Sequence, residues 1–161
     1  MAIDLSTATE DELAEFCEGS CHVFALALHR LTGWVMHAVL DLGEPYWIDP
    51  EDDDNFIPAV AHVFCVDGEG RFWDIRGCRP ASDVHSEMTD WLDFNEYGSE
   101  DLHDEDSLRT YVGYWSDEGD PIDRPLWDYA EEDISAAESL IRRVLAGVRG
   151  SPFEAQVQPA L

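Results

Sequence analysis

The run Gly19-Ser20-Cys21-His22 places a cysteine at the predicted start of a helix. A glycine–serine turn leads into the stretch from Cys21 to Leu31, which is apolar on most sides and therefore predicts a central, buried helix. The first N–H groups of a helix are unpaired and carry partial positive charge. They favour a thiolate over a thiol, and they can also hold a developing oxyanion. Cys21 is therefore the candidate nucleophile.

His62 and Asp74 are the candidate base and the acid that orients it. Two strand-like runs flank the turn-rich segment 67–70 and predict a β-hairpin, with His62 on the first strand and Asp74 on the second. A three-residue connection pairs Val66 with Gly70 and sets His62 opposite Asp74, with their Cβ atoms about 5 Å apart. A four-residue connection would put the two side chains on opposite faces.

The order of these three residues resembles the papain-like superfamily in its compact bacterial and phage forms, which include transglutaminase-like proteins. The resemblance covers roughly residues 15–78. It implies a papain-like core, with Cys21 as nucleophile, His62 as base and Asp74 as orienting acid. The activity it implies is acyl transfer on a protein or peptide: amide hydrolysis, deamidation or transglutamination.

The same residues also fit simpler hypotheses. Cys21 could be a small buried hydrophobe, and His62 and Asp74 an ordinary cross-strand pair. A fold of this kind that has lost its chemistry would carry the same pattern. A zinc site built from Cys17, Cys21 and His22 lacks a CxxC pair, so we expect neither a metal nor another cofactor.

Charge is the most unusual feature of the composition. The chain has 36 acidic and nine basic residues, all nine of them arginine, for a formal charge of -27. Direct binding to nucleic acid or to an anionic membrane is therefore disfavoured. The acidity could serve solubility or salt adaptation, dock a basic partner, or imitate the charge of DNA.

Residues 83–133 concentrate this acidity, with Arg109 and Arg124 as the only basic residues of the segment. We expect most of its carboxylates to face water, and they suggest an alternative function. The chain would be a non-catalytic nucleic-acid mimic, of the phage anti-restriction or anti-CRISPR type, that blocks a basic nucleic-acid-binding groove on a host defence complex. The predicted partner-binding residues are Asp90, Asp93, Glu96, Glu100, Asp101, Asp104, Glu105 and Asp106.

The fold class predicted is α+β, with a central helix on a small antiparallel sheet and further helices towards the C-terminus. We expect one domain over residues 1–149, a flexible tail over 150–161, a cytoplasmic location and four reduced thiols. The predicted helices cover 6–17, 21–31, 88–93, 105–114 and 128–146, and the predicted strands cover 34–40, 46–48, 61–66 and 72–76.

Overall fold

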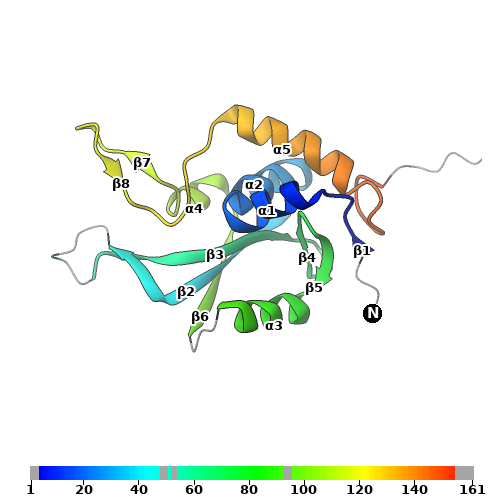
Figure 1. The fold of residues 1–161 in the computed structure, drawn as a ribbon, viewed down its shortest axis with the longest axis horizontal. Coiled ribbons are helices and arrows are strands. Elements are labelled where there is room, and N and C mark those ends of the chain that lie inside the picture. The colour runs from blue at the N-terminus through cyan, green and yellow to red at the C-terminus, as the bar shows by residue number, and fades with distance from the viewer. Residues whose placement is uncertain (1–3, 48–50, 52–53, 93–95, 155–161) are drawn as a thin grey trace, which may run out of the picture.

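The structure is a computed structural model that describes residues 4–47, 51, 54–92 and 96–154. It is an α+β fold in three layers (Figure 1). The helices α1 (Glu10–Glu18), α2 (Cys21–Thr32) and α5 (Glu131–Val144) cover one face of an antiparallel sheet, and α3 (Ala81–Leu92) covers the other. The predicted α+β class is confirmed.

Among the described residues, six strands form the main sheet in the order β1-β5-β4-β3-β2-β6. All of their pairings are antiparallel. The strands are β1 (Asp4–Leu5), β2 (Val35–Trp47), β3 (Phe56–Val66), β4 (Arg71–Asp74), β5 (Gly77–Pro80) and β6 (Tyr97–Leu102). A short helix α4 (Glu105–Arg109) follows β6, and β7 (Tyr114–Trp115) and β8 (Pro121–Ile122) pair as a separate hairpin.

The helix α2 is the central helix that its apolar sequence predicts. Its residues from Cys21 to Leu28 are all buried, and it packs on α5 on one side and on β3 on the other. Gly33 ends it in the left-handed conformation, at φ 74°, where a glycine has no Cβ to clash. The preceding helix α1 starts later than predicted, because Thr9 and Glu12 form the capping box there.

The β3–β4 hairpin differs from its predicted register by two residues. Val66 pairs with Phe72 rather than with Gly70, and Cys65 pairs with Trp73. The carboxylate of Asp67 causes this wider turn, since it accepts hydrogen bonds from the Glu69 and Arg71 backbones and from the Trp73 indole. A shift of two residues preserves the alternation of side chains, so His62 and Asp74 still share a face.

Each face of the sheet has its own apolar cluster. Val63, Cys65 and Trp73 belong to the large core under α2 and α5. Phe64 and Phe72 lie on the face that α3 covers, with their ring centroids 4.5 Å apart. Beyond α5 the chain remains packed, because Ser151 is buried and Phe153 contacts the core. The predicted tail begins at 150, and its residues 155–161 lie outside the described part.

Candidate active site

Cys21 occupies the first position of α2, as predicted from the glycine–serine turn. Ser20 is the N-cap residue but makes no side-chain capping hydrogen bond. The backbone N–H groups of Cys21 and His22 open the helix, so neither has a carbonyl four residues back within it. These two N–H groups are at the positive end of the helix dipole and are the candidate oxyanion donors.

His62 and Asp74 meet as a buried pair. The His62 Nε2 atom lies 3.0 Å from Asp74 Oδ2, and both residues are almost fully buried, with 1 % and 4 % of their surface exposed. The predicted shared face of the hairpin is therefore confirmed, although the two residues are diagonal neighbours rather than directly opposed. Since Nε2 is bonded to Asp74, Nδ1 is the nitrogen left for the Cys21 sulfur.

The ionisation of Cys21 and His62 is coupled. Burial alone would raise the pKa of the Cys21 thiol, but the imidazoles of His22 and His62 lower it to about 6. Burial alone would lower the pKa of His62, but its hydrogen bonds to Asp74 and Cys21 raise it to about 9. Between these values the pair is a thiolate beside an imidazolium, which is the reactive form of a cysteine nucleophile.

Two arginines hold the orienting carboxylate, and sequence reasoning missed both. Arg76 and Arg79 donate to Asp74 Oδ2 over 2.7 and 3.1 Å, and the Arg76 backbone N–H donates to Oδ1 over 2.8 Å. Burial would raise the pKa of Asp74, but His62 and Arg76 hold it far below its usual range. Glu87 on α3 accepts from both guanidinium groups and so fixes them in turn.

The signal for this cluster lies in the spacing of Asp74, Arg76 and Arg79. A strand end followed at once by another strand brings these three residues together, because β4 and β5 pair through a turn that sets Asp74 beside Gly77. Gly77 has φ 114° there, a conformation that favours glycine. The sequence prediction lacked the strand β5. Without that strand, the spacing alone did not show that Arg79 reaches Asp74.

His22 is the third residue whose role sequence reasoning missed. It is buried, with 1 % exposed, and its Nε2 atom lies 2.9 Å from the Trp127 carbonyl oxygen. Its Nδ1 atom is buried, and no well-aligned hydrogen bond reaches it from the described chain. Being next to Cys21 in sequence, this imidazole both lowers the pKa of the thiol and ties α2 to the segment before α5.

Cys17 and Cys65 lack the lowered thiol pKa of Cys21. Burial raises the pKa of Cys17 to about 11, and it raises that of Cys65 still further, while the Cys65 thiol donates to the Ala25 carbonyl over 3.2 Å. None of the four cysteines is part of a disulfide in the described chain. Within the described residues, no three histidine, cysteine or acidic side chains are arranged to hold a metal ion.

Two cavities flank the triad. One, of about 220 Å³, has Ser20, His22 and Val23 in its wall, opposite the segment from Trp127 to Tyr129. The other, of about 400 Å³, is lined by Arg76, Arg79 and Glu87 together with residues of β1 and α1. Cys21 itself is 6 % exposed and lines neither cavity, although its neighbours Ser20 and His22 line the smaller one.

The predicted acidic surface is only partly a free surface. Asp101 contacts His37 at 2.7 Å, Glu105 pairs with Arg30 at 2.7 Å, and Glu100 accepts from the Tyr111 hydroxyl. Asp104 caps α4 through Ser107. Even so, the expectation that most carboxylates of this half face water is confirmed, because every described acidic residue of 83–133 except the half-buried Glu105 is exposed. Asp90, Glu96 and Asp106 are exposed, and Asp93 lies outside the described residues.

The exposed acids have a structural use as well. In the described part of the chain, β6 is one of the two edge strands of the sheet, next to β2, and it carries Glu100 and Asp101. Charged side chains on an edge strand discourage pairing with another chain.

No protein-family model, curated protein or solved structure is significantly similar to this chain. No helix in the described part of the chain has the length and apolar character needed to cross a membrane. The functional conclusion therefore has to come from the geometry around Cys21.

Proposed function

We propose that the chain is a papain-like thiol acyl-transfer enzyme that hydrolyses or deamidates an amide of a protein or peptide. One observation carries this proposal: His62 is bonded to the buried Asp74 at 3.0 Å, and its imidazole lowers the pKa of Cys21 at the N-terminus of α2. An ordinary structural His–Asp pair needs no thiol with a pKa lowered to about 6 beside it.

In the proposed reaction, the Cys21 thiolate attacks the carbon of the substrate carbonyl group. The oxygen of that carbonyl group takes the negative charge, which the N–H groups that open α2 stabilise. The C–N bond then breaks, and the proton on His62 passes to the leaving nitrogen. Water, deprotonated by the now neutral His62, hydrolyses the thioester and releases a carboxylic acid. Asp74 stays ionised throughout and holds the imidazole in position.

A direct test incubates the full chain with a mixture of acetylated peptide amides and follows the products by mass spectrometry. Wild type is expected to release a carboxylic acid and an amine or ammonia, and Cys21→Ala is expected to lower the rate at least about 1,000-fold. Cys17→Ala is the matched control and should keep the rate. Equal turnover by the Cys21→Ala variant would remove the proposal.

A second candidate function is the non-catalytic nucleic-acid mimic, and the formal charge of -27 favours it. It requires a partner with a basic groove, and the exposed carboxylates Asp90, Glu96 and Asp106 are the side chains available to it. Its test is capture by DNA- or RNA-binding proteins at low salt. Binding that is indifferent to salt would remove it.

A further inference from the structure

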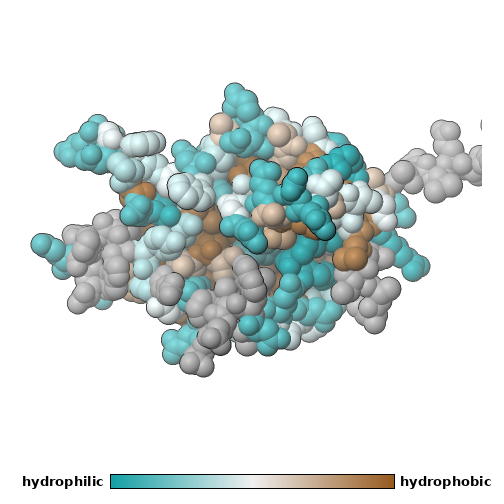
Figure 2. Space-filling view, viewed as in Figure 1, coloured by the Kyte–Doolittle hydropathy of each residue, from teal (hydrophilic) through white to brown (hydrophobic). Residues whose placement is uncertain are grey.

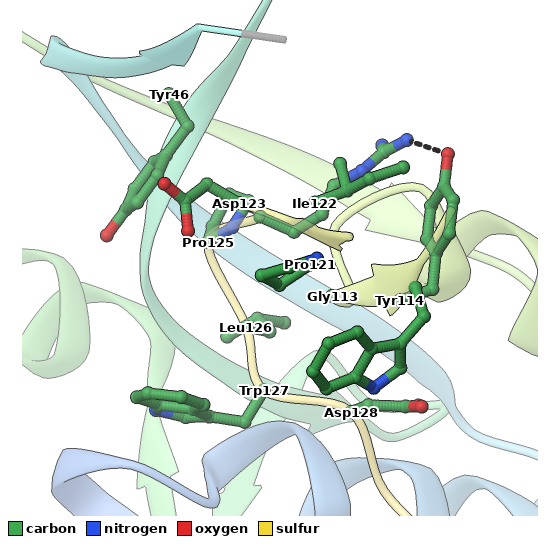
Figure 3. A pocket seen from close by; sticks show the side chains of 12 residues that line it. Tyr46, Gly113, Tyr114, Pro121, Ile122, Asp123, Pro125, Leu126, Trp127 and Asp128 are labelled. Atoms are coloured by element: carbon green, nitrogen blue, oxygen red, sulfur yellow. Dashed lines mark hydrogen bonds between the residues drawn. The ribbon is translucent and has the colours of Figure 1, made fainter. Parts of the chain in front are cut away.

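An aromatic pocket lies next to the cavity that Ser20 and His22 line. This cavity of about 330 Å³ is formed by the β7–β8 hairpin, the segment that follows it and one residue of β2 (Figure 3). Tyr46, Tyr114, Trp115 and Trp127 supply its aromatic side chains. Trp115 and Trp127 are 67 % and 80 % exposed, although an indole would gain much from burial. Exposed aromatic groups around a cavity mark a binding site.

The pocket is also acidic. Asp123 and Asp128 lie in its wall, and Figure 3 shows the carboxylate of Asp123 on the same side as the ring of Tyr46. Asp128 is paired with Arg109 over 2.8 Å. For Asp123, by contrast, no ion pair is found within the described residues, so this carboxylate is available to a cation. The hydrophilic surface of the hairpin is visible in Figure 2.

The pocket wall already holds one guanidinium on an aromatic ring. Arg124 lies over Tyr114 at 4.8 Å from the ring centroid, and it donates to the Tyr114 hydroxyl and the Thr110 carbonyl over 2.7 and 2.6 Å. Nearby, Arg109 lies over Tyr129 at 4.0 Å. Arg124 is thus committed to the pocket wall, and its contact with Tyr114 shows that one of the pocket's aromatic rings accepts a guanidinium. Arg109 is committed to Asp128 and to Tyr129 beside the pocket.

The same segment joins this pocket to the triad. Trp127 and Asp128 line both the aromatic pocket and the smaller cavity beside Ser20 and His22. The Trp127 carbonyl oxygen is bonded to His22, the residue next to Cys21. A peptide with its scissile bond at Cys21 could therefore place a neighbouring side chain among the aromatic rings.

We propose that the aromatic pocket is a substrate subsite for an arginine side chain. The inference rests on the proposed function, whose substrate class it narrows to basic peptides. A guanidinium can stack its flat face on an indole or phenol ring and pair its edge with the Asp123 carboxylate, whereas a lysine ammonium is a compact point charge. The strongly negative charge of the whole chain would attract such a peptide.

The test measures binding without turnover, with the full-length Cys21→Ala variant and acetylated, amidated glycine–arginine–glycine as the probe. The comparison peptide has citrulline in place of arginine, which keeps the planar shape and removes the charge. We expect the arginine peptide to quench tryptophan fluorescence and to bind at least about tenfold more tightly than the citrulline peptide. Adding Trp127→Ala or Asp123→Asn should each weaken the binding of the arginine peptide several-fold. Tyr97→Ala removes a partly exposed aromatic ring outside the pocket and should leave binding unchanged.

Equal affinity for the two peptides, or an arginine affinity that Trp127→Ala leaves unchanged, would overturn the subsite. Turnover of amides by wild type, without the arginine preference, would retain the proposed function and remove this inference. Preferential binding of the arginine peptide by a chain that cleaves no amide would retain the arginine site and remove the proposed function.

Discussion

The surroundings of Asp74 and those of Asp123 show what burial does to a carboxylate. Asp74 is 4 % exposed and bonded to His62, Arg76 and Arg79, so the charges around it are balanced and fixed. Asp123 is exposed in the wall of an aromatic pocket, with no ion pair among the described residues. A buried carboxylate can orient a base, because its interactions are little screened. A solvated carboxylate can instead pair with a positively charged ligand.

This contrast predicts the largest effect at Asp74. Replacing it by asparagine removes the charge that compensates Arg76 and Arg79, and the free energy of unfolding should fall by about 3 kcal/mol or more. Asp123→Asn, as the matched exposed variant, should change it by less than about 0.5 kcal/mol. Urea unfolding of the two variants gives the comparison. Similar losses at the two positions would mean that the buried cluster contributes no special stability.

The next effect is on pH dependence. Loss of a proton from Cys21 near pH 6 and from His62 near pH 9 predicts a bell-shaped kcat/KM for amide hydrolysis between these values. A kcat/KM that only rises with pH, through the ordinary range of thiol pKa values, would contradict the coupled ionisation of Cys21 and His62.

The free energy of unfolding should depend on pH over the same range, from about 6 to about 9. The raised pKa of His62 stabilises the fold below its ordinary value of about 6.5, and this contribution disappears as pH rises through about 9. The lowered pKa of Cys21 stabilises the fold above about 8.5, and this contribution disappears as pH falls through about 6. Relative to Cys21→Ala, the wild type is expected to lose stability on both sides of the window, as measured by urea unfolding over a pH series.

The smallest effect is expected from the solvated carboxylates. They repel one another at neutral pH, so added salt should raise the melting temperature by a few degrees as the Debye length falls from about 10 Å at 0.1 M to about 3 Å at 1 M. Thermal unfolding monitored by circular dichroism measures this. A melting temperature that falls with salt would show that ion pairs such as Arg30–Glu105 outweigh the repulsion.

Local patterns predicted the elements that carry the triad. The sequence around Cys21 predicted the first residue of α2 correctly. The alternation along the hairpin placed His62 and Asp74 on one face. Alternation survives a shift of two residues, which is why the face was right although the pairing of Val66 was wrong.

Long-range contacts account for what the sequence did not reveal. The strands β5 and β6 carry Gly77, Cys78, Gly98 and several charges, so their own propensity is weak, and pairing with β4 and β2 is what orders them. The roles of Arg79 and His22 depend on those distant partners: Asp74 across a hairpin and Trp127, which is 105 residues away in sequence. Chemical type alone assigns neither.

The central claim is that Cys21 is a thiolate paired with the His62 imidazolium at neutral pH. The most direct measurement is the ultraviolet absorbance of the thiolate over a pH series, taken as the difference between wild type and Cys21→Ala. We predict a midpoint near pH 6 that moves to the alkaline side in His62→Ala. A midpoint at or above the ordinary thiol value of about 8.5 in the wild type would contradict the account.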